Sequence, residues 1–115
     1  MKKFYYLSTC DTCKRILKEL DPPTDVKLQD IKEFPILDEE LEKLKNLSGS
    51  YESLFNKRAR LYKERGLKNQ ELSEEDYKDL LLEHYTFLKR PVLLMDDQIF
   101  IGNSKKTVEE AKKAL

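Results

Sequence analysis

Apolar positions in the first third of the chain alternate between strand-like runs and helical spacing. Residues 3–7 form a short aromatic-rich run that predicts a strand. Residues 11–20 predict a helix because their apolar positions recur on one stripe, and prolines at 22–23 end it. A second strand is expected at about residues 26–31. The pattern therefore predicts a β–α–β unit with parallel strands.

The next part of the chain shows only helical spacing. Asp38 is expected to cap a helix with leucines as far as Leu47, and Leu37 is expected to pack at its entrance. The strongly basic residues 57–68 predict a further helix, which Gly66 ends. The middle of the chain is therefore expected to be helical.

A capping box at residues 73–76 predicts the start of the last helix in this middle part. Its apolar stripe continues to Leu88 and includes His84, the only histidine. On such a stripe a packed or capping histidine is favoured over a catalytic base. Residue 84 is therefore not predicted to be catalytic.

Strand pattern returns near the end of the chain. An apolar run at residues 92–95, a turn and a second run at 98–101 predict a β-hairpin. Ser104 is expected to cap a final helix. The predicted class is therefore α/β, with the order β-α-β, several helices, and β-β-α.

Length and charge limit the class of protein. The 115 residues fit one domain, and no apolar run approaches the roughly 20 residues that a membrane span requires. No signal-peptide pattern is visible, so we expect a cytoplasmic protein without a membrane partner. The 22 basic and 22 acidic residues balance, so direct binding to nucleic acid is not expected.

The only two cysteines form a C-x-x-C motif between the first predicted strand and the first predicted helix. The first N–H groups of a helix lack partners and carry the positive end of its dipole. A cysteine at this place can have its pKa lowered from about 8.5 to between roughly 3.5 and 7.5. Cys13 lies one turn after Cys10, within reach to resolve a mixed disulfide. The motif predicts thiol–disulfide exchange or reduction of an oxidised small species.

Two other interpretations of the cysteine pair remain open. A closed zinc site needs four ligands, and His84 with a carboxylate would have to complete it. The cysteines can also be small buried apolar residues without chemistry. Redox use is favoured over both because thiols stay reduced in the cytoplasm, and no metal site is predicted. The basic segment at 57–68 is either a solvated helix face or a source of cations that help the thiol site hold an anion.

Four motifs at matching spacing resemble the arsenate-reductase-like family, which includes ArsC enzymes, Spx-type regulators and YffB proteins. They are C-D-T-C-K-R from residue 10, L-F-N-K-R from residue 54, E-H-Y-T-F-L-K-R-P-V from residue 83, and I-G at residue 101. The resemblance implies a thioredoxin/glutaredoxin-like fold. Its core is expected at residues 1–34 and 89–115, with a mostly helical insertion at about 37–88.

The resemblance also implies roles for individual residues. Cys10 falls on the nucleophilic cysteine, and Cys13 falls on the second cysteine of Spx-type members, as the resolving thiol. Arg90 precedes Pro91, which in this fold is typically a cis-proline that faces the active cysteine. The predicted catalytic residues are therefore the two cysteines and Arg90, with Pro91 at the substrate.

Thr12, Lys14 and Arg58 complete the predicted substrate-binding residues. Lys14 stands where ArsC enzymes usually have arginine, and Arg58 matches an arginine of Spx and YffB members. Two further oxyanion-binding arginines of ArsC enzymes fall on Asn56 and Asn103. An oxyanion site built this way holds less positive charge than that of a dedicated arsenate reductase.

The resemblance leaves three functions open. The first is reduction of arsenate, or of a related oxidised thiol or oxyanion, with no bound cofactor and with glutathione/glutaredoxin or thioredoxin as the external reductant. The second is an Spx-type redox-sensing regulator that binds RNA polymerase. The third is an oxidoreductase with a working thiol and no efficient arsenate turnover.

Overall fold

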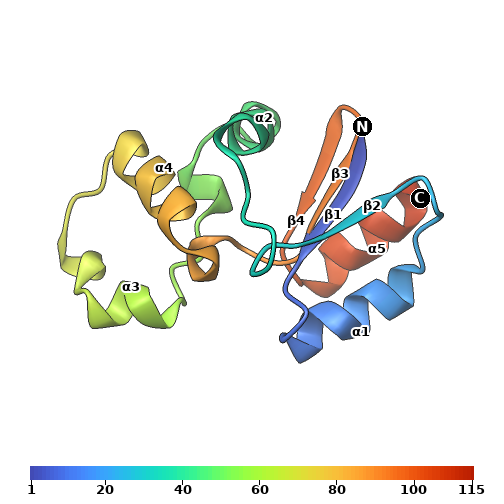
Figure 1. The fold of residues 1–115 in the computed structure, drawn as a ribbon, viewed down its shortest axis with the longest axis horizontal. Helices are drawn as coiled ribbons and strands as arrows, with labels where there is room; N and C mark the ends of the chain where they lie inside the picture. The colour runs from blue at the N-terminus through green and yellow to red at the C-terminus, as the bar shows by residue number, and fades with distance from the viewer. The chain divides into compact units, whose positions relative to one another are not determined.

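The computed structural model describes all residues from Met1 to Leu115, which form two compact units. We call them the sheet unit, comprising Met1–Phe34 and Arg90–Leu115, and the helical unit, Pro35–Lys89. Figure 1 shows the elements of both.

The sheet unit contains one four-stranded sheet in the order β2-β1-β3-β4. The strands are β1 (Lys2–Tyr6), β2 (Lys27–Asp30), β3 (Val92–Met95) and β4 (Gln98–Ile101). β1 runs parallel to β2 and antiparallel to β3, and β3 pairs antiparallel with β4. This arrangement confirms the predicted β–α–β unit and the predicted hairpin.

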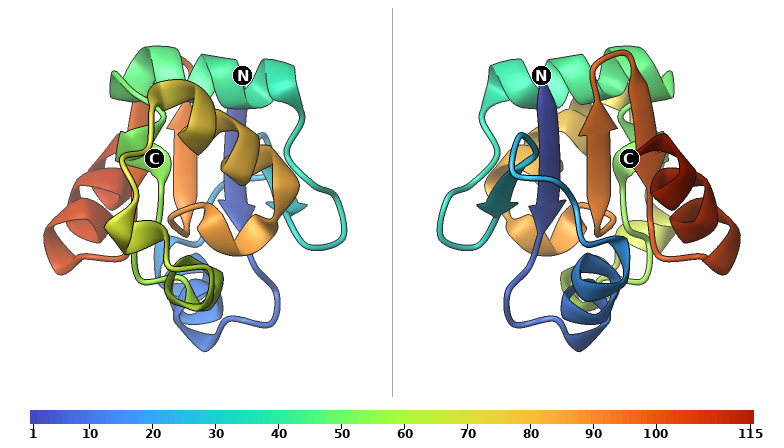
Figure 2. Two further views of the ribbon diagram at one scale, coloured as in Figure 1. Left: turned by 90° about the vertical axis from the view of Figure 1, so that its left-hand side faces the viewer. Right: turned by 90° about the vertical axis from the view of Figure 1, so that its right-hand side faces the viewer.

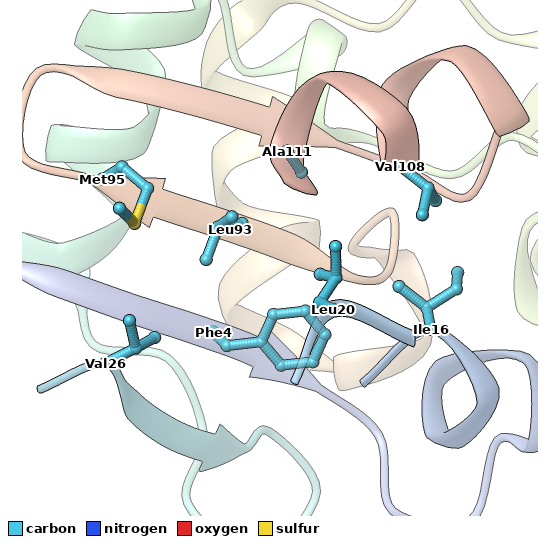
Figure 3. Close-up of a cluster of buried hydrophobic side chains, with 8 residues drawn as sticks. All are labelled: Phe4, Ile16, Leu20, Val26, Leu93, Met95, Val108 and Ala111. Atoms are coloured by element: carbon cyan, nitrogen blue, oxygen red, sulfur yellow. The ribbon is translucent and has the colours of Figure 1, made fainter. Parts of the chain in front are cut away.

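Two helices, α1 (Asp11–Leu20) and α5 (Lys105–Ala114), pack against one face of this sheet (Figure 2). Their buried side chains join those of the strands in one apolar cluster (Figure 3). The cluster consists of Phe4, Ile16, Leu20, Val26, Leu93, Met95, Val108 and Ala111. Its burial fixes α1 on the sheet, because apolar area removed from water stabilises the fold.

The ends of these helices agree with the sequence pattern. The hydroxyl of Ser104 accepts the N–H of Thr107 at 3.1 Å, as an N-cap does. Asp21 ends α1 in the left-handed conformation, and its N–H donates to the carbonyl of Leu17 at 3.0 Å. The element order and the sheet confirm the thioredoxin-like fold that the motifs implied.

The helical unit combines helices with 3₁₀ turns. It contains α2 (Asp38–Ser48), α3 (Arg60–Glu64), α4 (Glu74–Glu83) and three 3₁₀ turns. The turns are η1 (Glu52–Leu54), η2 (Leu67–Asn69) and η3 (Tyr85–Phe87). The predicted helical character is confirmed, although the basic segment forms only the single short helix α3.

An aromatic cluster forms the interior of the helical unit. The ring of Phe55 lies 5.0 Å from that of Tyr77, 5.2 Å from that of Phe87 and 5.7 Å from that of Tyr62, measured between centroids. Phe55 is 1 % exposed, and it pairs with Leu88 in an isolated β-bridge. Edge-to-face and stacked rings stabilise such a cluster beyond the area that they bury.

Three sequence expectations in this unit are wrong. Asp38 does not cap α2 but is its first residue, because Leu37 takes the N-cap position. Leu37 does not pack at the entrance of α2 but is 65 % exposed, because it is itself the extended N-cap residue and its N–H donates to Glu40. The helix from residue 74 does not reach Leu88, because α4 ends at Glu83 and His84 is extended. The Nδ1 of His84 accepts the N–H of Thr86 at 3.1 Å, which confirms a capping histidine.

Candidate active site

Cys10 is the N-cap residue of α1, in extended conformation between β1 and the helix. Its N–H donates to the carbonyl of Leu7 at 3.0 Å, and its carbonyl accepts the N–H of Lys14 at 3.1 Å. The side chain is partly exposed. A thiol at this place combines access for a substrate with the free N–H groups of the first helical turn.

Cys13 lies in the first turn of α1 and is fully buried. Burial raises the pKa of the Cys13 thiol to about 11, and its hydrogen bond to Cys10 adds to this effect. The main chain of Leu7 and the charge of Arg90 oppose it. Cys13 is therefore protonated near neutral pH, and its S–H donates to the sulfur of Cys10.

The pKa of Cys10 moves in the opposite direction. Burial, the largest single effect, would raise it, but the backbone N–H and the thiol of Cys13 act in the opposite direction. The positive charge of Arg90 and the backbone N–H of Thr12 lower the pKa further. The net result is a thiol whose pKa lies below its ordinary value, which makes Cys10 the better nucleophile of the two.

Arg90 and Pro91 lie just before β3, joined by a cis peptide bond. The carbonyl of Pro91 accepts the N–H of Gly102 at 2.9 Å, which ties it to the end of β4. Arg90 is partly buried, and its charge acts on both thiols. The structure thus brings Arg90 to the cysteine pair, where its cation can stabilise a thiolate or an anionic substrate.

The other predicted binding residues are placed less directly. Thr12 contributes its backbone N–H to Cys10, as described. Lys14 is exposed, with its Nζ 4.0 Å from the Asp11 carboxylate, which is a weak surface pair. Arg58 belongs to the helical unit and has an exposed side chain, so its role at the thiols stays a prediction.

The two asparagines at family arginine positions have local surroundings of their own. The Oδ1 of Asn56 accepts the N–H of Arg58 at 3.0 Å, which forms a turn within the helical unit. Asn103 is exposed between Gly102 and the N-cap of α5. Neither observation places a charge at the thiol pair.

Sequence reasoning missed one polar contact beside the cysteines. The hydroxyl of Ser8 donates to Asp30 at 2.5 Å, and Asp30 is the last residue of β2. The predicted β–α–β unit could have indicated this contact, because the carboxyl ends of its parallel strands meet at the same edge of the sheet. A polar residue near the end of the second predicted strand was therefore a candidate neighbour of the cysteine motif.

No group of three or more His, Cys, Asp or Glu side chains in the chain is placed to hold a metal ion. None of the helices combines the length and the apolar composition needed to cross a membrane. What the arrangement offers is thiol chemistry: an accessible thiol with a lowered pKa, a protonated second thiol in contact with it, and a nearby cation.

A thioredoxin-like sheet with such a thiol pair at the start of α1 defines the class of thiol-based oxidoreductases. The chain belongs to the ArsC family, because the family model matches residues 5–111. A comparison with curated proteins gave no match.

Solved structures agree with this assignment. An ArsC-family-related protein from Bacteroides fragilis is 25% identical over 96% of both chains, with a TM-score of 0.78. A protein from Staphylococcus aureus COL is 32% identical, with a TM-score of 0.77, and 96% of this chain and 97% of that chain are covered. An arsenate reductase from Vibrio cholerae is 20% identical over 99% of this chain and 97% of its own, with a TM-score of 0.78, and shares the fold.

Proposed function

We propose that the protein is a thiol–disulfide oxidoreductase in which Cys10 attacks an oxidised substrate and Cys13 resolves the intermediate. The observation that supports this most directly is the thiol pair itself. One sulfur is accessible with a lowered pKa, and the other is buried, protonated and hydrogen-bonded to the first. Such an asymmetric pair separates the attacking thiol from the resolving thiol.

With a disulfide substrate, the Cys10 thiolate attacks one sulfur and forms a mixed disulfide while the other substrate sulfur leaves as a thiolate. Cys13 then loses its proton to the departing group and attacks the Cys10 sulfur. The second substrate thiol leaves, and a Cys10–Cys13 disulfide forms. The cysteine pair thereby supplies two electrons, and an external thiol system restores it.

Reduction of an oxyanion substrate also takes two electrons from the cysteine pair. Arsenate, H₂AsO₄⁻, accepts two electrons from the two thiols and becomes arsenite, H₂AsO₃⁻, while the thiols form a disulfide and one water leaves. Arg90 would stabilise the anion next to Cys10, and the N–H groups at the start of α1 would add donors. Thr12, Lys14, Pro91 and Arg58 are proposed to contact the substrate.

The reductant is proposed to be glutathione with glutaredoxin, or thioredoxin. A disulfide between Cys10 and Cys13 is the natural substrate of a dithiol reductase, whereas a mixed disulfide on Cys10 alone suits glutathione. The two systems therefore predict different requirements for Cys13.

The test is a steady-state assay of the purified protein on arsenate and on a glutathione mixed disulfide, each with glutaredoxin or thioredoxin. Cys10→Ser should abolish turnover in every combination. Cys13→Ser, the matched control, should keep a reactive Cys10 and lose formation of the intramolecular disulfide. Turnover that survives in Cys10→Ser would contradict the proposal, as would a wild-type protein that turns over neither substrate.

A further inference from the structure

Asp30 connects the end of β2 to the loop that follows β1. It lies beside Tyr6, the last residue of β1, in the parallel register. Its carboxylate accepts the Ser8 hydroxyl at 2.5 Å, the Ser8 N–H at 3.4 Å and the Lys32 N–H at 3.2 Å. The two Ser8 donors tie Ser8 to the carboxylate, and the Lys32 N–H holds the carboxylate itself at the end of the sheet.

Ser8 is part of the segment that carries the reactive thiol, residues 7–10, which we call the cysteine loop. On one side of Ser8, the main chain of Leu7 is hydrogen-bonded to the sulfur of Cys13. On the other side, the N–H of Cys10 donates to the carbonyl of Leu7 at 3.0 Å. A displacement of Ser8 would therefore move the backbone that holds both sulfurs.

We infer that Asp30 is a positioning residue for the thiol pair: through Ser8 it fixes the cysteine loop so that the Cys10 sulfur lies at the N–H donors of α1. The inference rests on the proposed function only where it names Cys10 as the attacking thiol. The contacts that carry it are independent of any substrate. Hydrogen bonds to a charged group are strong enough for this role, since they stabilise more than neutral ones.

Because Asp30 is charged, a positioning role and a direct electrostatic effect predict opposite changes in the pKa of Cys10 when Asp30 is removed. The Ser8 hydroxyl holds the pKa of Asp30 below its ordinary value against the opposing effect of burial, so the group is a carboxylate at neutral pH. A nearby negative charge disfavours a thiolate, and its removal would by itself lower the pKa of Cys10. Loss of a positioning contact has the opposite effect, because the sulfur moves away from its donors.

The experiment measures the alkylation rate of Cys10 against pH, site by site with mass spectrometry, in the wild type and four variants. Asp30→Ala should react about three- to tenfold more slowly at pH 7, because the thiolate fraction falls about tenfold for each unit that the pKa rises. Ser8→Ala should show a smaller loss, of about two- to threefold, since the Ser8 N–H still reaches the carboxylate.

Two variants serve as controls. Asp30→Asn should restore most of the rate, because its amide oxygen can accept the N–H groups of Ser8 and Lys32 and its amide N–H can donate to the Ser8 hydroxyl, without the charge. Asp25→Ala removes an exposed carboxylate of the same unit whose partner is Lys2 at 3.2 Å, and it should leave the rate unchanged. Recovery in Asp30→Asn together with loss in Asp30→Ala is the signature of positioning.

An unchanged or faster alkylation in Asp30→Ala, with only a lower unfolding stability, would overturn the inference. If Asp30→Ala does not fold, Ser8→Ala decides the question, and a wild-type rate in that variant overturns it. Alkylation needs no substrate, so the outcome is independent of turnover. A wild type without turnover, combined with the expected alkylation pattern, would contradict only the proposed function.

Discussion

The sheet unit and the helical unit reach stability by different means. In the sheet unit, α1 and α5 have ten residues each, and both bury one apolar face on a regular sheet. In the helical unit, α2 and α4 have eleven and ten residues without a sheet to pack on, α3 has five, and three 3₁₀ turns lie between the helices or follow the last one. Regular apolar spacing on a sheet therefore organises the sheet unit, whereas contacts of individual side chains organise the turns of the helical unit.

Particular contacts hold the helical unit at its turns. The Glu74 carboxylate accepts the N–H groups of Tyr51 and Glu52 at 2.7 Å and 3.2 Å. The Phe55 ring contacts three other aromatic rings. In the sheet unit, polar side-chain contacts lie at the chain start, at the cap of α5 and, between Ser8 and Asp30, at the loop that carries Cys10. One specific contact of the regular scaffold, between Ser8 and Asp30, therefore lies in the loop that carries the reactive thiol.

The largest expected effect in this comparison is the loss of the Phe55 ring. Phe55→Ala should lower the free energy of unfolding by about 3–5 kcal/mol, because the buried ring leaves a cavity among its aromatic partners. Urea denaturation measures the change. The control is Phe34→Ala, where the ring is 62 % exposed and the change should stay within about 0.5 kcal/mol. Equal effects would show that the aromatic cluster does not hold the helical unit.

A second prediction concerns Cys13 and alkaline pH. Its pKa in the folded protein is about 11, above the roughly 8.5 of an unfolded chain. The neutral thiol is therefore favoured by folding, so its contribution is fully present below pH 8.5 and is lost as the pH rises toward about 11. This amounts to about 2–3 kcal/mol across that window.

The measurement compares unfolding stability against pH in the reduced wild type and in Cys13→Ser. Lysines and tyrosines titrate in both proteins, so the difference between the two curves isolates Cys13. The wild type should lose more stability than the variant between about pH 8.5 and 11. Parallel curves would contradict a buried, protonated thiol.

A smaller effect is expected when Arg90 of the sheet unit is compared with Arg58 of the helical unit. Arg90→Ala should raise the pKa of Cys10 and slow its alkylation at pH 7 by about threefold, since Arg90 favours the thiolate. Arg58→Ala should leave the alkylation rate unchanged. On an oxyanion substrate, Arg90→Ala should also lower kcat/KM more than Arg58→Ala. Equal losses of kcat/KM would show that the helical unit contributes as much to anion binding as Arg90 does.

The sequence predicted the sheet unit well because apolar positions recur regularly along α1 and short apolar runs mark its strands. The range expected for α1 matches the structure, and the hairpin follows from two apolar runs around a turn. The position of the cysteine motif was predicted for the same reason. A pattern that repeats over ten residues outweighs local irregularity.

The helical unit was predicted less well because single side chains decide its turns. His84 lies at helical spacing in the sequence, yet its ring accepts a backbone N–H and the helix ends before it. At the site, Asp30 was missed because its contact with Ser8 joins residues far apart in the sequence. The spacing of apolar residues does not predict such a contact. Only the parallel order of β1 and β2 indicates that residues at their carboxyl ends lie close together.

The central claim is that Cys10 is the reactive thiol and that Cys13 stays protonated beside it. Site-resolved alkylation of the reduced wild type across pH 5 to 12 tests this directly. Cys10 should be labelled first, with an apparent pKa below the ordinary value of about 8.5, and Cys13 should stay unlabelled until the pH approaches about 11. Labelling of both cysteines with one common pKa near 8.5, or of Cys13 before Cys10, would contradict the account.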